Sequence, residues 1–191
     1  MTLRRRVGGA VVGALFVCAV ASGCNQPPAD FSVSPEAPAR GWSEDIGVSE
    51  AVTVTNVVDG DTVDVATSTG GSARVRVIGI DTPETNQPST PEQCWGPEAT
   101  DFARSLLDGR QVGMVTDPSQ DEVDDYGRLL RYLVLPDGRD YSIAAAEAGA
   151  ARSYVYDRAD PPTAAVNIND AENRAQAAGA GVWGPPCNGD T

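Results

Sequence analysis

The chain has 191 residues, with 27 acidic and 14 basic side chains, a net charge of −13, and no histidine. The lack of histidine excludes a Ser-His-Asp triad, a histidine general base and an imidazole-ligated zinc site. Any acid–base chemistry therefore falls to carboxylates, assisted by arginine and an oxygen-liganded metal such as calcium. The net negative charge also repels polyanions, so a nucleic-acid partner would have to bind despite this electrostatic repulsion.

Residues 1–23 have the composition of an export signal. Three consecutive arginines precede a short apolar stretch at residues 11–20, and small residues then lead to Cys24. The apolar stretch is shorter than the ~20 residues that span a membrane. The pattern resembles a bacterial lipoprotein signal, which would make Cys24 a lipidation site, although Ala21 stands where leucine or valine is usual. An ordinary cleaved signal is the alternative.

Residues 24–50 are predicted to be a proline-rich tether, because prolines interrupt them and their few apolar residues show no period. Residues 51–187 are long enough for one domain with its own core, followed by a tail at 188–191. Removing the signal takes away three arginines and no acidic residue, which leaves 11 basic and 27 acidic residues and a net charge of −16. We expect an exported, monomeric protein on the outer face of the membrane or shed from it.

The cysteines also indicate an exported protein in an oxidising compartment. Cys18 leaves with the signal and Cys24 is the lipidation candidate, so Cys94 and Cys187 remain as a pair. In an exported domain this pair predicts a disulfide. Two buried free thiols are the alternative.

The apolar periodicity predicts five short strands and three helices. The strands are expected at residues 52–55, 62–65, 73–80, 111–115 and 129–135, and the helices at 97–107, 142–148 and 163–178. A helix between the third and fourth strands is the order of an OB-type barrel. The fold class is therefore α+β, a five-stranded OB-fold β-barrel with three helices.

Asp61 has an unexpected place in this pattern. It shares one face of the second strand with Val63 and Val65, and we expect those valines to point into the barrel. A carboxylate at such a position is costly unless it is paired or binds a cation. Asp61 is therefore a candidate functional residue, with a plain turn residue as the alternative.

Five segments in order resemble the staphylococcal nuclease (thermonuclease) family. Each is weak alone, but their order and spacing make coincidence improbable. The segments are Val58-Asp59-Gly60-Asp61-Thr62-Val63, Arg76 with Ile80-Asp81-Thr82-Pro83-Glu84-Thr85, Trp95-Gly96-Pro97-Glu98-Ala99, Asp125-Tyr126-Gly127-Arg128 and Tyr154-Val155-Tyr156. The resemblance implies a calcium-dependent phosphodiesterase that acts on DNA or RNA and leaves 3′-phosphates.

The resemblance also implies roles for individual residues. Asp61 and Asp81 would ligate Ca²⁺ through their side chains and Thr82 through its carbonyl, which suits a hard cation. Glu84 would orient or deprotonate the attacking water. These carboxylates stay ionised at neutral pH, as a general base must.

The arginines and tyrosines are the expected contacts to the substrate. Arg76 and Arg128 would clamp the scissile phosphate, because guanidinium forks match phosphate oxygens. Tyr126 and Tyr154 would contact the nucleotide. The alternatives are an Arg128 that only stabilises its turn and tyrosines that only pack.

Two alternatives concern Arg76 and the whole domain. Arg76 could be a surface partner of Asp64 or Glu84. The domain could instead be a catalytically weak calcium- or ligand-binding surface lipoprotein. One departure from the family favours weak polyanion binding, since Asp125 stands where the family often has a lysine, within an acidic loop at residues 121–125.

Overall fold

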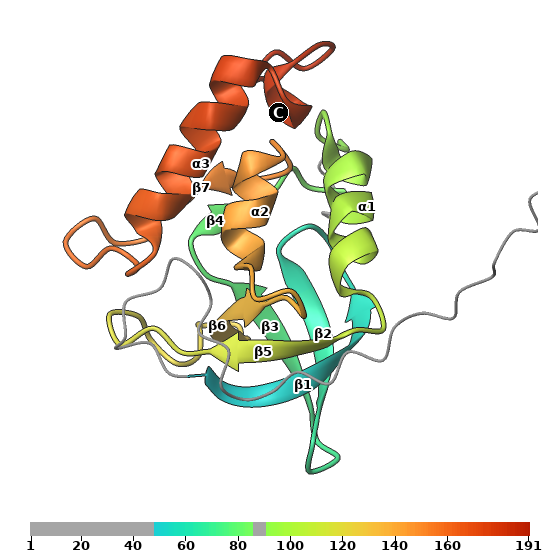
Figure 1. Cartoon of the computed structure of the whole chain (residues 1–191), viewed down its shortest axis with the longest axis vertical. Coiled ribbons are helices and arrows are strands. Elements are labelled where there is room, and N and C mark those ends of the chain that lie inside the picture. Colours follow the sequence, from blue (N-terminus) through green and yellow to red (C-terminus); the bar gives the residue numbers. More distant parts are fainter. Residues whose placement is uncertain (1–47, 86–90) are drawn as a thin grey trace, which may run out of the picture. The chain divides into compact units, whose positions relative to one another are not determined.

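The computed structural model describes residues 48–85 and 91–191, and its central feature is a closed five-stranded barrel (Figure 1). Around the barrel the order is β1-β2-β3-β6-β5, with β1 pairing to β5 to close it. All neighbours are antiparallel except β3 and β6. The strands are β1 Val48–Val57, β2 Thr62–Thr67, β3 Ser72–Val77, β5 Gln111–Val115 and β6 Leu129–Val134.

Three helices complete the predicted fold class, which is confirmed. The helix α1 (Gly96–Leu107) connects β4 to β5, as the sequence pattern predicts. The other two helices, α2 (Tyr141–Glu147) and α3 (Ala165–Ala178), follow the barrel, and a short 3-10 helix η1 (Gly181–Trp183) comes last. In Figure 1, α2 lies between α1 and α3 and contacts both.

The barrel interior is filled by the alternating valines. Val63 and Val65 of β2 and Val75 and Val77 of β3 are all buried, and the residues between them are more exposed. This is the period-two pattern of strands with one face on a core. The inward orientation expected for Val63 and Val65 is confirmed.

The strand predicted at residues 73–80 is corrected by the structure. It breaks after Val77, because Gly79 has a positive φ of 83° and a Cβ there would lie 2.5 Å from Ile168 on α3. The chain resumes as β4 (Ile80–Asp81), which pairs with β7 (Arg152–Ser153) in a separate two-stranded sheet. The glycine thus turns Asp81 out of the barrel.

The expected signal at 1–23, the lipidation site Cys24 and most of the tether lie outside the described residues. The strand β1 begins at Val48, within the last residues of the segment predicted as a tether. Over residues 48–85 and 91–191, no helix is long and apolar enough to cross a membrane.

A disulfide joins Cys94, just before α1, to Cys187 in the C-terminal tail, as the cysteine count predicts. The tail is held further by Arg152, which donates a hydrogen bond to the Gly189 carbonyl and lies 4.7 Å from the Trp183 ring centre. The two cysteines are 93 positions apart in the sequence, so the disulfide closes a long loop.

Removing this disulfide with the double change Cys94→Ser and Cys187→Ser is expected to lower the free energy of unfolding by about 4 kcal/mol. The reason is that a cross-link over a long loop restricts the unfolded chain. Urea unfolding of the wild type with and without reductant, beside the serine variant, measures the loss. Reductant should weaken the wild type only, and an unaffected wild type would contradict the prediction.

The start of α2 contains an unusual carboxylate. Asp140 caps the helix by accepting the Ser142 amide at 2.6 Å, but its Oδ2 atom has no hydrogen-bond partner among the described residues. Burial raises the pKa of Asp140 to about 7. Because the folded-state pKa lies above the unfolded value of 3.8, the ionised group costs stability above pH 7, and this cost disappears as the pH falls toward 3.8.

The variant Asp140→Asn is therefore expected to raise the free energy of unfolding by about 1–3 kcal/mol above pH 7, since a buried charge is removed and asparagine caps helices as well as aspartate. The gain should shrink as the pH is lowered toward 5. Urea unfolding of both proteins between pH 5 and 9 tests this. A difference that is independent of pH would contradict the assigned titration.

Candidate active site

The turn between β1 and β2 places Asp61 at the rim of the barrel. Val58 and Asp59 both donate their amides to the Thr62 carbonyl, which closes the turn. The buried Tyr141 hydroxyl donates to the Gly60 carbonyl at 2.6 Å. Glycine is required at position 60, because a Cβ there would lie 2.7 Å from the Thr82 side chain.

Asp61 is buried, with 4% of its surface exposed, and both of its carboxylate oxygens have partners. Its Oδ1 atom lies 3.0 Å from Nη1 of Arg76 and accepts the Thr62 hydroxyl at 3.1 Å. Its Oδ2 atom accepts the Thr82 amide at 2.9 Å and the Thr82 hydroxyl at 3.0 Å. These bonds offset the cost of burying the carboxylate and join the two acidic motifs.

Arg76 lies between two carboxylates. Its Nη2 atom is 3.2 Å from Oδ1 of Asp81, while Nη1 contacts Asp61 and donates to the Ile80 carbonyl at 2.9 Å. Arg76 is therefore not a surface partner of Asp64, whose ion pair is with Arg74 at 2.8 Å. The structure brings together Asp61, Asp81, Thr82 and Arg76, four of the predicted site residues.

The carboxylates around Arg76 repel one another. Burial, and then the charge of Asp61, raises the pKa of Asp59 to about 6. Partial burial and the same Asp61 charge raise the pKa of Asp81, and Glu84 contributes to both shifts. One guanidinium thus does not neutralise the negative charge gathered at this rim.

Glu84 is positioned through its backbone. Its amide donates to the side-chain oxygen of Gln93 at 2.7 Å, and the Gln93 amide donates to the Glu84 carbonyl at 3.0 Å. Gly96 packs so closely that a Cβ there would lie 2.8 Å from the Glu84 carbonyl oxygen. The Glu84 carboxylate itself makes no hydrogen bond or ion pair with another described residue. This leaves the group available to water.

The structure places Arg128 and Tyr126 in a turn of their own. Asp124 accepts both of their amides, and its Oδ2 atom lies 2.6 Å from Nε of Arg128. The guanidinium also stacks 5.4 Å from the Tyr126 ring centre. The turn leads directly into β6, whose first residue Leu129 pairs with Val75 of β3. Arg128 makes no contact with Asp61, Asp81 or Glu84 in the described part of the chain.

Tyr154 follows β7, which pairs with the strand that carries Asp81. In that pairing Arg152 lies opposite Asp81, and the Tyr154 amide donates to the Gly79 carbonyl at 2.9 Å. The side chain of Tyr154 is on the surface, with the residue 42% exposed. Packing in the core is therefore excluded for Tyr154, and its contact with a nucleotide stays a prediction.

The donors at this rim suit calcium in kind, since carboxylate and carbonyl oxygens are what it binds. Their unbalanced negative charge also favours a divalent cation. In the structure, these side chains do not form a metal site: within the described residues, no group of three or more acidic or cysteine side chains could hold a metal ion. Arg76 pairs with one oxygen of Asp61 and one of Asp81.

Two residues of the site were not predicted from the sequence. Asp59 has no individual role in the sequence-based prediction, although it stands two residues before Asp61 and its Oδ1 atom accepts the Asp61 amide at 3.1 Å. The role of Gln93 could not be predicted from the sequence, because its hydrogen bond to Glu84 joins residues that are nine positions apart. A second carboxylate in the Asp-Gly-Asp motif was the available hint for Asp59.

The chain is similar in sequence to known nucleases. The family described as staphylococcal nuclease homologue matches residues 74–185. The thermonuclease of Staphylococcus intermedius is 35% identical over 134 residues, which is 70% of this chain and 76% of that protein. The thermonuclease of Staphylococcus hyicus is 39% identical over 104 residues, 54% of this chain and 59% of that protein. Endonuclease YncB of Bacillus subtilis is 35% identical over 107 residues, 56% of this chain and 49% of that protein. The chain belongs to the staphylococcal nuclease family.

Proposed function

We propose that this protein is a calcium-dependent nuclease that hydrolyses the phosphodiester bonds of DNA or RNA and leaves 3′-phosphate ends. The observation that carries the proposal is the set of carboxylates around Arg76, with Asp61 and Asp81 both within 3.2 Å of its guanidinium. A cation bound by these carboxylates and the adjacent fixed guanidinium would both stabilise the negative charge of a dianionic transition state. Family membership supports the nuclease activity.

Each residue has a role that its position allows. Asp61, Asp81 and the Thr82 carbonyl would hold Ca²⁺, which supplies positive charge at the phosphate and acidifies water. Glu84 accepts the proton of the attacking water, because its carboxylate is free and its backbone is fixed by Gln93. As the water oxygen bonds to phosphorus, the bond from phosphorus to the 5′ oxygen breaks and the leaving 5′ oxygen takes a proton from solvent. Glu84 then releases its own proton to solvent.

The two arginines act on the phosphate. Arg76 is held by the Ile80 and Val77 carbonyls at 2.9 and 3.2 Å, so its direction is set before substrate binds. Such preorganised charge stabilises the oxygens of the transition state without reorganisation. Arg128 joins by exchanging Asp124 for a phosphate oxygen, a step that requires its turn to adjust.

The proposal places the protein outside the cell, held by a lipid on Cys24 or shed. The sequence of residues 1–24 supports export, and the disulfide between Cys94 and Cys187 fits an oxidising compartment. The oligomeric state is proposed to be a monomer.

A second candidate is a catalytically weak, calcium- or ligand-binding surface lipoprotein. The ion pair between Arg128 and Asp124 at 2.6 Å favours it, because it occupies one of the two arginines needed for catalysis. The net charge of −16 expected after removal of the signal favours it as well, since 11 basic against 27 acidic residues make a surface that opposes polyanions. Under this reading the protein binds calcium but does not cleave.

One experiment separates the two functions. The purified protein is given a fluorogenic single-stranded DNA with millimolar calcium or with chelator, and the product ends are tested with a 3′-phosphatase. Cleavage that requires calcium and leaves 3′-phosphates supports the nuclease. Calcium binding by titration calorimetry without cleavage, from folded and disulfide-bonded protein, supports the binding function instead.

A further inference from the structure

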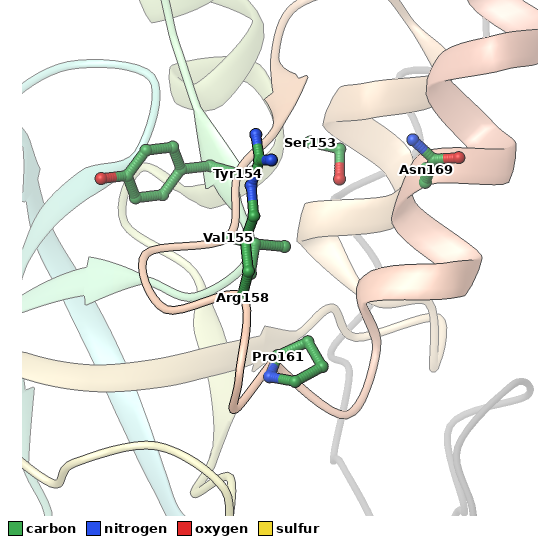
Figure 2. Close-up of a pocket in the computed structure, with 6 residues that line it drawn as sticks. All are labelled: Ser153, Tyr154, Val155, Arg158, Pro161 and Asn169. Atoms are coloured by element: carbon green, nitrogen blue, oxygen red, sulfur yellow. The ribbon is translucent and has the colours of Figure 1, made fainter.

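A pocket of about 560 Å³ lies between the segment that follows β7 and helix α3 (Figure 2). Figure 2 shows the Arg158 side chain running along this pocket toward the backbone of Tyr154, with Ser153 and Asn169 on the α3 side. The Tyr154 ring points away from α3. The pocket is lined by Ser153, Tyr154, Val155, Arg158, Pro161 and Asn169.

Arg158 differs from the other arginines of residues 48–85 and 91–191. Each of the others has an ion pair, a hydrogen bond or an aromatic ring as a partner. Arg158 makes none of these contacts with the described residues. In a chain with 27 acidic residues, an arginine left without a carboxylate is a position where an outside anion can bind.

Two acidic residues near the pocket, Asp157 and Glu172, have other partners. The carboxylate of Asp157 accepts the Ala159 amide at 2.8 Å, which turns it into its own loop. Glu172 of α3 accepts the Ser153 amide at 3.1 Å and the Gln176 side chain at 3.3 Å. The Oδ1 atom of Asn169 accepts the Asn173 side chain at 3.0 Å, which leaves its Nδ2 group as a donor. The Arg158 guanidinium, the Ser153 hydroxyl and this Nδ2 group are thus the donors that the pocket offers to a phosphate.

The strand pair β4–β7 carries residues of both the pocket and the proposed active site. Ser153 pairs with Ile80 and Arg152 pairs with Asp81, so the first pocket residue is next to the residue opposite a proposed calcium ligand. The exposed Tyr154 follows at once. A strand of nucleic acid whose scissile phosphate lay at Arg76 would reach this pocket by crossing the β4–β7 pair, since Arg152 and Ser153 point to opposite faces of β7.

We propose that this pocket is a subsite for a phosphate of the nucleic-acid chain other than the one that is cleaved, with Arg158 as its main contact. OB folds bind about 4–16 nucleotides of single strand, so a substrate extends well beyond one scissile bond. The inference rests on the proposed function and adds to it a preference for substrates longer than a dinucleotide. The subsite offsets part of the repulsion from the acidic surface.

The test compares Arg158→Gln with the control Arg174→Gln. Arg174 is also exposed, but it lies on α3 and is paired with Glu147 at 3.1 Å. For each protein kcat/KM is measured on a dinucleotide, which has no phosphate beyond the scissile one, and on a single strand of about twelve nucleotides. We divide kcat/KM on the longer strand by kcat/KM on the dinucleotide. This ratio should be about tenfold lower in Arg158→Gln than in the wild type, the effect of losing one charge-assisted hydrogen bond. In Arg174→Gln the ratio should stay at the wild-type value.

The dependence on salt gives a second readout that a merely structural role would not change. On the longer strand, the slope of log kcat/KM against log salt should become less negative by about 0.7 in Arg158→Gln only, the value for one phosphate contact to a single strand. An unchanged length ratio and slope, in proteins that still cleave, would overturn the subsite and leave the nuclease standing.

If none of the proteins cleaves, the proposed function fails, and the subsite is decided by binding. Fluorescence anisotropy with a labelled strand of the same length, in chelator, then gives the dissociation constants directly. Weaker binding by Arg158→Gln than by Arg174→Gln supports the subsite, and equal binding overturns it.

Discussion

Replacing Arg76 with glutamine is expected to lower the free energy of unfolding by about 3 kcal/mol in the absence of calcium. The change leaves Asp61 buried without its cation, and breaking a buried ion pair by removing one partner costs about 3–5 kcal/mol. The lower end applies because Asp61 keeps the two bonds from Thr82 and the one from Thr62. Urea unfolding with a chelator measures the loss.

Arg74→Gln is the matched control. Arg74 lies on the same strand, and its ion pair with Asp64 also reaches across to β2, at 2.8 Å. Its side chain is 51% exposed, however, against 15% for Arg76. Exposed ion pairs contribute about 0.2–1 kcal/mol, so the control should lose less than 1 kcal/mol. Equal losses in the two variants would contradict the view that Asp61 needs Arg76.

Calcium adds a distinguishing test to the same pair of variants. If the acidic rim binds the cation, calcium should restore part of the stability of Arg76→Gln, because it neutralises the charge that the arginine left behind. Arg74→Gln should gain no more from calcium than the wild type does. A lack of rescue would place the calcium site elsewhere.

The sequence predicted the barrel because its strands carry a local signal. Val63 and Val65 alternate with polar residues, and this period alone orients them and also points Asp61 inward. The break at Gly79 was not predicted, since the apolar pattern continues through Ile80. Only the packing of Ile168 from a distant helix shows why the chain must turn there.

The partners of the arginines were harder to predict for a similar reason. Asp64 and Glu84 are the partners that the sequence suggests for Arg76, but the register pairs Asp64 with Arg74 and Thr62 with Arg76. Arg76 therefore contacts Asp61, which the sequence did not suggest as its partner. Such a register depends on the turn between β2 and β3. The hydrogen bond between Gln93 and Glu84 likewise joins residues nine positions apart, so no short sequence pattern predicts it.

Glu84→Gln is expected to lower kcat by about 10²–10⁴-fold, the usual contribution of general acid–base catalysis. Glutamine keeps the size and polarity of the side chain but does not accept a proton from water. The value of kcat on single-stranded DNA, at saturating calcium, measures the effect. Glu92→Gln is the matched control, because Glu92 lies in the same connection, is exposed and is expected to keep the wild-type rate.

The design isolates the chemistry because Glu84 is positioned through its backbone. The two bonds to Gln93, at 2.7 and 3.0 Å, involve the amide and the carbonyl of Glu84 and not its carboxylate. The substitution therefore removes none of the hydrogen bonds that hold the residue in place. It does remove one of the negative charges near Asp59 and Asp81, so kcat is measured at saturating calcium. A full rate in Glu84→Gln would assign the base to another carboxylate of the rim, with Asp59 the nearest to Asp61 in sequence.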